Sequence, residues 1–503
     1  MDYGANITRS VGRQGLNALM FVRGLLGYLP ANIIQAVVGV LTILVFTRLL
    51  SSTEFGIYAL AFSVASLAHV LIFTWIEGAM ARYWAGEATS EGLANLYSTL
   101  YNTGLLLSLL FIPAAAAVCL WVPLGIEMRI AMAIGLAGVP IRCLLNMVKV
   151  ALRARGAVRQ AAGLDIYFSL AVFILGIAAA WLGLGGASPL VGLLIAPLLA
   201  LPFALPLERG KLWSGRFNAV RLKNYIAYGY PISMSLGMAL ILASTDRFML
   251  GWLMNEAAVG AYHASYSIAN RTLDIIFIWL GTAGAPALVM ALEKGGARAL
   301  KLAAVDQARI LMLVTLPAAV GVALVARPLA EVVIGPELRT ASAMVTPWIA
   351  ASAFLSGWLY YYFNQAFTLS KRTSILLLTM VFPAIANIGL NMILIPEMGL
   401  MGAAISTVLG YFVGVLASII MARRIMPMPI PWKDFMLCGL CAAVMAIVVA
   451  CLPQFGGFLE LMIDAAVGGI VYCVLAYGTN AGGVRDLLKR IRSLRITPEE
   501  LTL

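Results

Sequence analysis

One apolar stretch of the sequence, "ASYSIANRTLDIIFIWLG" at residues 264–281, carries three polar groups near its middle. They are the amide of Asn270, the guanidinium of Arg271 and the carboxylate of Asp274. Charged side chains within a membrane span usually face a bundle interior or a water-filled cavity, where they mark the path of a substrate or an ion. Because a helix rises about 1.5 Å per residue, Arg271 would lie roughly 20 Å from the outer end of its span. The stretch therefore predicts a polar site deep within a membrane.

Arginine is suited to binding anions, because its planar fork stays protonated and can hold phosphate oxygens through two hydrogen bonds. Four arginines are candidates: Arg271, Arg142 at a similar depth, and Arg48 and Arg247 at helix ends. Structural alternatives stay open for all four. Arg271 and Asp274 share one helix face and can pair to lock two helices together, whereas Arg48 and Arg247 can extend to the membrane surface.

Ion coupling needs a group that takes up a proton or holds a sodium ion inside the membrane. Asp274, Glu77 and His69 lie within apolar stretches and are candidates for this role. Histidine titrates near neutral pH, although His69 could instead form a hydrogen bond with a neighbouring helix. Asp246 stands next to Arg247, so we interpret these two residues as a local pair.

The elements that position these groups follow from the composition. Of 503 residues, 62% are hydrophobic and 11% are charged, whereas a soluble domain has about 45–50% apolar and about 25% charged residues. The chain is therefore expected to be an integral membrane protein. Two histidines and six cysteines do not indicate a metal site or disulfides, and the CxxC of Cys438 and Cys441 lies in an apolar run that favours packing. The sequence contains no GxxxxGK[ST] phosphate-binding loop.

Apolar stretches near or above about 20 residues predict membrane-spanning helices. About fourteen are present, so we expect an all-α polytopic membrane protein. They cover residues 27–48, 55–82, 95–122, 128–150, 163–184, 187–207, 225–250, 258–290, 302–327, 341–369, 374–396, 400–422, 435–453 and 457–480.

The distribution of lysine and arginine predicts the orientation, since short cytoplasmic loops carry an excess of both. Alternate loops are basic, as are residues 1–24, an expected interfacial N-terminal helix, and the tail 483–503. Both termini are therefore expected in the cytoplasm. The net charge of +12 is spread over many loops and gives little support to nucleic-acid binding. Among the residues interpreted as topology determinants are Lys149, Arg153, Arg155 and Arg159.

The two halves of the chain resemble each other. "GYLP" at 27–30 opens the first span and "GYP" at 229–231 the seventh, and each of these spans ends in an arginine followed by a short loop and Gly-x-Tyr. The halves share one orientation, so they form a parallel repeat. We expect an N-lobe at 25–210, a C-lobe at 211–424 and two further helices at 425–482. Arg271 falls opposite Leu67 of the first half, which favours a substrate role for this asymmetric charge.

Two motifs resemble a known family. "RLLSSTEFGIYALAFSVASL" at 48–67 and "LNMILIPEMGLMGAAISTVLGY" at 390–411 are similar to signatures of the polysaccharide transporter family, within the multidrug/oligosaccharidyl-lipid/polysaccharide exporter superfamily. The resemblance implies two six-helix lobes around a central cavity that opens alternately to either side. It also implies a polyprenyl-diphosphate-linked oligosaccharide as cargo, moved across the bacterial inner membrane for cell-surface or exopolysaccharide biosynthesis.

With that cargo, the arginines Arg271, Arg142, Arg48 and Arg247 become candidate diphosphate ligands. Asn270, Tyr266 and Tyr58 are weaker candidates for binding sugar, since tyrosines near helix ends often form interface belts. No cofactor is expected beyond coupling to H⁺ or Na⁺. Membrane lipid and a polysaccharide polymerase or assembly protein are the expected partners.

Three other functions stay open. A cation-coupled drug antiporter of the same superfamily would need a mainly acidic cavity, whereas the deep charges here lean basic. A membrane enzyme of polysaccharide assembly would need a sizeable outer loop with catalytic groups, and the predicted loops are short, so we expect no enzyme. A scaffold for assembly partners would use the deep arginines only for stability.

Overall fold

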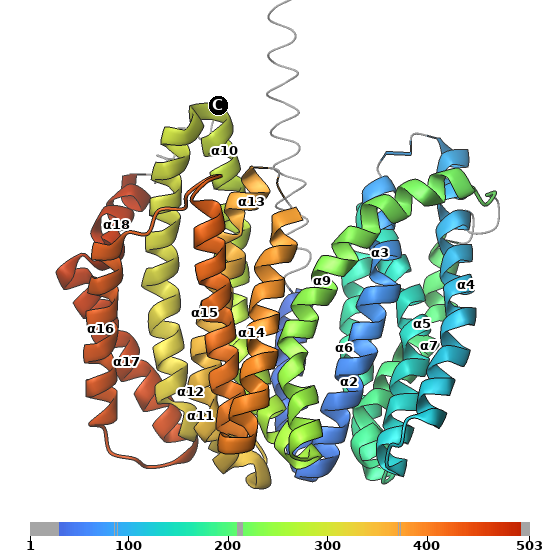
Figure 1. Cartoon of the computed structure of the whole chain (residues 1–503), viewed down its shortest axis with the longest axis horizontal. Coiled ribbons are helices and arrows are strands. Elements are labelled where there is room, and N and C mark those ends of the chain that lie inside the picture. The colour runs from blue at the N-terminus through green and yellow to red at the C-terminus, as the bar shows by residue number, and fades with distance from the viewer. Residues whose placement is uncertain are drawn as a thin grey trace, which may run out of the picture. The chain divides into compact units, whose positions relative to one another are not determined.

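The computed structural model describes residues 30–84, 86–87, 89–208, 215–370, 372 and 374–493. The expected interfacial helix at 1–24 and residues 494–503 of the basic tail lie outside these ranges. Throughout the described residues the regular structure is helical and contains no strand, which confirms the expected all-α fold (Figure 1). The chain divides into two compact units, Met1–Leu240 and Ile241–Leu503. The lobe boundaries expected from the sequence stay a prediction.

Twelve helices of the described chain are long and apolar enough to cross a membrane. Each of the fourteen predicted spans overlaps a helix, because hydropathy over about 20 residues is a strong local signal. The twelve are Pro30–Leu49, α2 (Ser52–Ile72), α4 (Ser90–Trp121), α5 (Ile126–Ala154), α6 (Val158–Trp181), α7 (Ser188–Ala204), α9 (Ala219–Leu253), α10 (Glu256–Leu324), α14 (Ser374–Met398), α15 (Leu400–Ala422), α16 (Trp432–Ala450) and α17 (Gly457–Thr479).

The difference between twelve and fourteen has two causes. Helix α10 contains two predicted spans, 258–290 and 302–327, joined across Gly296, whose φ of 63° breaks the helical geometry. The predicted span 341–369 corresponds to α12 (Pro336–Trp358), a π-helical turn at Leu359–Phe363 and the short α13 (Gln365–Leu369). Four of the buried residues of α12 are serine or threonine, which lowers its hydropathy and suits a helix that packs against α10 and α15.

The predicted span 55–82 is broken at Phe73 into α2 and α3 (Thr74–Trp84). The motif "LSSTEFG" starts α2 with a capping box: Glu54 donates its backbone N–H to the Ser51 hydroxyl, and the Glu54 carboxylate accepts the Ser51 backbone N–H at 2.8 Å. At the other end, the Phe73 backbone N–H still donates to the His69 carbonyl. The break lets residues on both sides of Phe73 face each other.

In the first unit, α5 packs against α2, α3, α4, α6 and α7. A buried ion cluster joins it to α6: the Lys149 ammonium lies 3.1 Å and the Arg153 guanidinium 2.6 Å from the Asp165 carboxylate. Lys149 is only 8% exposed. Two of the four residues that we interpreted as topology determinants, Lys149 and Arg153, thus also neutralise the buried Asp165 carboxylate between two helices.

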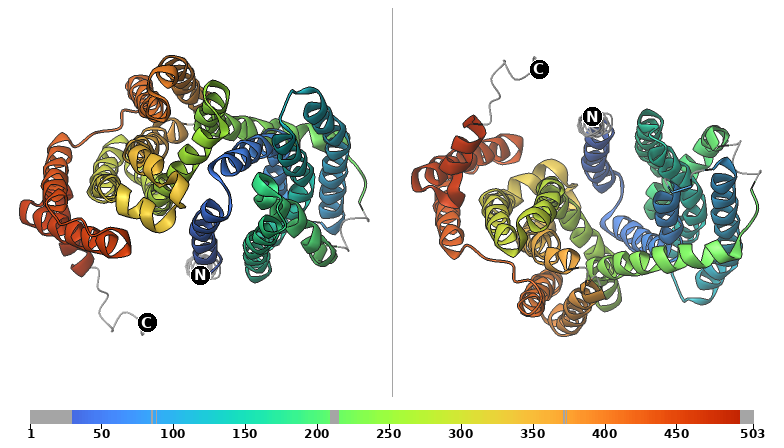
Figure 2. Two further views of the ribbon diagram at one scale, coloured as in Figure 1. Left: turned by 90° about the horizontal axis from the view of Figure 1, so that it is seen from below. Right: turned by 90° about the horizontal axis from the view of Figure 1, so that it is seen from above.

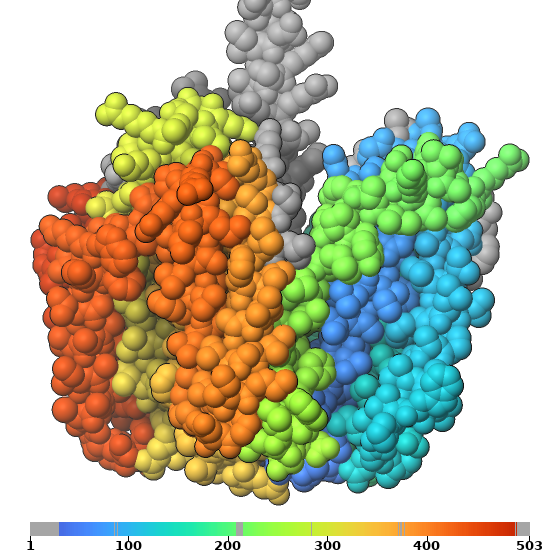
Figure 3. All heavy atoms as spheres, in the orientation of Figure 1, coloured from blue at the N-terminus to red at the C-terminus, as the bar shows by residue number. Residues whose placement is uncertain are grey.

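In the second unit, α10 packs against α12 and α16, and α14 packs against α15, with their side chains filling the space between the ribbons (Figure 3). Helices α16 and α17 lie side by side at one edge of this unit (Figure 2). The Arg309 Nε atom of α10 lies 2.9 Å from the Asp434 carboxylate of α16. Two short helices, α11 (Ala326–Val333) and α18 (Val484–Ser493), complete the described part of this unit with the 3₁₀ turn Ala481–Gly483.

Helices α6 and α7 approach each other closely at Gly192, and this close approach can be tested by a change in stability. A Cβ atom there would lie 2.2 Å from the carbonyl oxygen of Val172. We expect Gly192→Ala to lower the melting temperature in detergent, measured by tryptophan fluorescence, because overpacking costs about 1–3 kcal/mol. Gly163→Ala in α6 is the control, since its Cβ would meet no atom within 4 Å. Equal melting temperatures for the two variants would contradict the close approach.

Candidate functional site

Arg271 is an exposed side chain on α10. Within the described part of the chain, no hydrogen bond or ion pair engages its guanidinium. The nearby Asp274 carboxylate accepts a hydrogen bond from the Asn270 amide at 2.5 Å and interacts with Arg271 electrostatically at longer range. The hydrogen-bonding partner of Asp274 is therefore the amide, and the guanidinium stays available to a ligand.

Arg247, on α9, is 7% exposed and packs inside the second unit. Its guanidinium carbon lies 4.8 Å from the centre of the Tyr266 ring, which in turn stacks against Tyr262. A guanidinium over a tyrosine face is favourable. Thus two predicted site residues from α9 and α10, Arg247 and Tyr266, do meet, and Arg247 does not extend to the surface of the unit.

The remaining arginine candidates lie in the first unit. Arg48 is exposed at the end of the helix Pro30–Leu49 and donates to the Leu44 carbonyl at 2.7 Å. Arg142 is half-buried on α5, one helical turn before Asn146. The sugar candidate Tyr58 is buried in α2, where its ring contacts Phe55 and Phe62. These three side chains have separate surroundings in the unit.

His69 and Glu77 meet across the break at Phe73. The His69 Nε2 atom lies 3.0 Å from the Glu77 carboxylate, and the Asn146 amide donates to the same oxygen at 3.1 Å. Glu77 also attracts the Arg142 guanidinium electrostatically. The structure therefore brings together two of the three residues predicted for ion coupling, and His69 bonds to α3 as its structural alternative required.

Asp246 is a second buried carboxylate, which we interpreted from the sequence only as a local pair with Arg247. Asp246 is 0% exposed and accepts four hydrogen bonds, from α10, α14 and α15. The donors are the Tyr262 hydroxyl at 2.8 Å, the Asn387 amide at 2.9 Å, the Asn391 amide at 2.8 Å and the Thr407 hydroxyl at 2.7 Å. The sequence signal was present in "NIGLN", where two amides one helical turn apart occupy an apolar helix.

The surroundings of Asp246 are rich in oxygen. The Thr407 hydroxyl oxygen also lies 2.8 Å from the Ala403 carbonyl oxygen, and the Asn391 Oδ1 atom is buried with no hydrogen-bond partner in the described structure. Carboxylate, hydroxyl and amide oxygens are the ligands that hard cations such as sodium prefer. Asp246, Asn387, Asn391 and Thr407 are therefore the residues that could hold such an ion. Across the described residues, no group of three or more His, Cys, Asp or Glu side chains has the arrangement of a metal site.

Comparison with known proteins agrees with this fold. A family described as "Polysaccharide biosynthesis protein" matches residues 45–343, more than half of the chain. An uncharacterized membrane protein of Methanocaldococcus jannaschii is 26% identical over 204 residues, which cover 39% of this chain and 38% of that protein. The match thus spans well under half the length of this relative.

Two solved structures share the fold. The lipid II flippase MurJ, in an inward closed conformation, superposes with a TM-score of 0.76 at 15% identity, covering 92% of this chain and 99% of that one. An inward-facing multidrug resistance MATE family transporter of the MOP superfamily gives a TM-score of 0.63 at 16% identity, covering 78% and 93%. The exporter fold and the family resemblance predicted from the motifs are confirmed. These two neighbours are described as a flippase and a transporter.

The oxygen-rich cluster predicts selective stabilisation by sodium. We expect NaCl to raise the melting temperature of the wild-type protein more than KCl at equal ionic strength, because an ion bound only to the folded state stabilises it by about 2.7 kcal/mol at a hundredfold excess over Kd. Asp246→Asn should abolish the difference. Asp306→Asn, at an exposed side chain 3.9 Å from Arg309, should keep it. Identical melting in both salts for wild type would show that the cluster is purely structural.

Proposed function

The chain belongs to the polysaccharide biosynthesis protein family, and from that premise we propose that it moves a polyprenyl-diphosphate-linked oligosaccharide across the bacterial inner membrane by alternating access. The product would serve cell-surface or exopolysaccharide biosynthesis. The similarity of fold to a flippase of a lipid-linked precursor supports this proposal. So does the composition, since the helices that carry the four candidate arginines are apolar enough to span a bilayer.

Arg271 is the observation that carries the proposal. Its charge stands on a membrane-spanning helix, yet the side chain is exposed and forms no hydrogen bond or ion pair with a described residue, while Asp274 interacts with it only at longer range. A cation in that position is costly against lipid and is stabilised by facing a polar cavity. A diphosphate is a suitable counter-ion, because the guanidinium can bind two of its oxygens at once. Asn270 and Tyr266 lie on the same helix and are proposed to contact the adjoining sugar.

The arginines in the first unit are proposed as further diphosphate contacts. Arg142 is half-buried and interacts electrostatically with Glu77, which in turn pairs with His69. Arg48 is exposed near the end of the first spanning helix, in keeping with a contact at the outer end of the path when both termini are cytoplasmic. Coupling to H⁺ at His69 and Glu77, or to Na⁺ at Asp246, would supply the driving force.

A cation-coupled drug antiporter is the second candidate, supported by the MATE-like fold. Two observations favour the lipid-linked cargo over it. The MATE transporter covers 78% of this chain and the flippase 92%. Arg271, exposed on α10, carries a positive charge, which would repel a cationic drug. A polymerase or assembly protein remains a proposed partner, and the basic loops support a cytoplasmic position for both termini.

Binding of the diphosphate can be measured directly. We expect purified wild-type protein to bind polyprenyl diphosphate in native mass spectrometry, and Arg271→Gln to weaken binding about tenfold or more, since hydrogen bonds to charged groups contribute about 1.5–3 kcal/mol. Arg271→Lys should retain part of the affinity, because it keeps the charge but loses the planar fork.

Arg298→Gln is the matched control, since Arg298 is another exposed arginine of α10. This variant should bind polyprenyl diphosphate with the affinity of the wild type. A loss of binding in any variant is assigned to the site only when its melting temperature equals that of the wild type. Unchanged binding in Arg271→Gln together with a lowered melting temperature would assign Arg271 a structural role. The diphosphate site would then have to be sought around Arg142, Arg48 and Arg247.

A further inference from the structure

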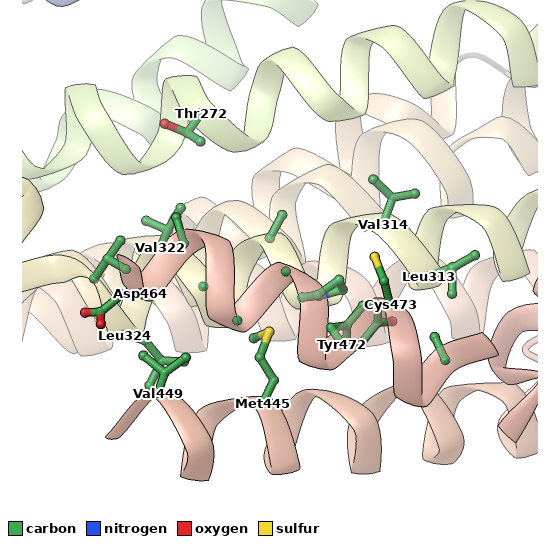
Figure 4. A pocket seen from close by; sticks show the side chains of 18 of the residues that line it. Thr272, Leu313, Val314, Val322, Leu324, Met445, Val449, Asp464, Tyr472 and Cys473 are labelled. Atoms are coloured by element: carbon green, nitrogen blue, oxygen red, sulfur yellow. The ribbon is translucent and has the colours of Figure 1, made fainter. Parts of the chain in front are cut away.

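A large apolar pocket lies within the second unit, between the C-terminal part of α10 and helices α16 and α17 (Figure 4). Its volume is about 770 Å³. Val322, Val449 and Met445 line it from α10 and α16, and Gly469 leaves space on α17. Its walls are almost entirely hydrocarbon, so the pocket suits a flexible apolar chain.

A smaller polar chamber of about 220 Å³ lies next to this apolar pocket. The two share Leu324, Val449 and Asp464 in their linings, so they are adjacent. The chamber lies where α10 and α16 end and α17 begins, at the level where spanning helices meet the membrane surface. Its polar lining consists of Arg327, Gln454, Glu460 and Asp464.

The chamber contains an acidic pair. Asp464 is 8% exposed, and no hydrogen bond or ion pair in the described part of the chain engages its carboxylate, which lines both spaces (Figure 4). Glu460, one turn earlier on α17, is 4% exposed and accepts one hydrogen bond, from the Gly456 backbone N–H at 2.6 Å. Two carboxylates on one helix face repel each other. A cation between them would relieve that repulsion.

Arg327 supplies the opposite charge at the rim of the chamber. Its guanidinium donates to Glu331 at 3.1 Å and to Gln454 at 2.5 Å. A guanidinium has five N–H groups, so further donors are available for an anion. The chamber thus presents a cationic and an anionic site next to a long apolar space.

We propose that this pocket binds a glycerophospholipid with a primary ammonium headgroup, of the phosphatidylethanolamine class. An acyl chain fills the apolar pocket, the phosphate contacts Arg327, and the ammonium lies between Glu460 and Asp464. This ligand is separate from the transported cargo, and its binding does not depend on the proposed transport function.

The headgroup class follows from the lining. A primary ammonium has three N–H donors that suit two carboxylates. A quaternary ammonium has none and is typically bound by aromatic rings, yet none of the described residues that line the chamber is aromatic. A purely anionic headgroup would be repelled by Glu460 and Asp464.

The length of the pocket suits one lipid leaflet. Its lining on α17 runs from Asp464 to Tyr477, which at about 1.5 Å per residue is roughly 20 Å. The hydrocarbon core of a bilayer is about 30 Å thick, so one leaflet contributes about 15 Å. A pocket of this length therefore holds an acyl chain that starts at the membrane surface and reaches slightly past the middle of the bilayer.

Lipid selectivity in native mass spectrometry tests the proposal. The purified full chain is titrated with phosphatidylethanolamine, phosphatidylcholine and phosphatidylglycerol that have identical acyl chains. We expect phosphatidylethanolamine to bind about tenfold more tightly than either competitor, because charge-assisted hydrogen bonds distinguish it. Asp464→Asn should abolish this preference, Arg327→Gln should weaken all three lipids, and Glu397→Gln, at an exposed carboxylate of α14, should change nothing.

A second variant tests the apolar pocket independently of the charges. Gly469→Leu should reduce binding of all three lipids, because a side chain there meets no protein atom within 4 Å and would enter the pocket. Gly439→Leu in α16, which is equally open but outside the pocket lining, should leave binding intact. Equal wild-type affinity for the three lipids, or displacement of phosphatidylethanolamine by equimolar polyprenyl phosphate, would overturn the proposal. If Asp464→Asn does not fold, the lipid selectivity of the wild-type protein and the lipid binding of Gly469→Leu still test the proposal.

Discussion

Within hydrocarbon, a carboxylate must find its hydrogen bonds inside the protein, and Asp246 obtains four of them from three other helices. Helices in a membrane gain little from apolar contact with each other, because lipid is equally apolar. The shared carboxylate therefore specifies which faces of α10, α14 and α15 meet α9. Much of the second unit depends on this one constraint, whether or not an ion joins the cluster.

The first unit follows the same rule with different chemistry. Asp165 is neutralised by Lys149 and Arg153, so ionic contacts join α6 to α5 beside the apolar contacts of Leu145, Val148 and Ala161. Glu77 is held by His69 and Asn146. Removing one member of a buried ion pair leaves an uncompensated charge and costs more than the pair contributes. These clusters thus fix the helix pairing strongly even where their net stabilisation is small.

The spans could be predicted from the sequence because hydropathy is local: every predicted stretch overlaps a helix. The break could not be located, since Phe73 is an ordinary helical residue and the His69–Glu77 contact across it is not visible in the sequence. The arginines were recognisable by their type. Their surroundings could not be predicted from the sequence. Both Arg271, which is exposed, and Arg247, which is buried, stand near apolar residues in the sequence. The role of Asp246 required amides more than 140 positions away, as its bonds to Asn387 and Asn391 show.

The π-helical turn at Leu359–Phe363 holds three consecutive tyrosines in different directions. The Tyr360 ring contacts Tyr411 of α15, and the Tyr361 ring stacks on Phe277 of α10. The Tyr362 hydroxyl lies within hydrogen-bonding distance of the carbonyl oxygens of Ala304 and Pro429. A π turn contains one residue more than an α turn, and such turns are often found at functional sites. Tightening it to α-helical geometry rotates the following segment by about 100°. The extra residue of this turn therefore sets which aromatic surface the segment presents to α10 and α15.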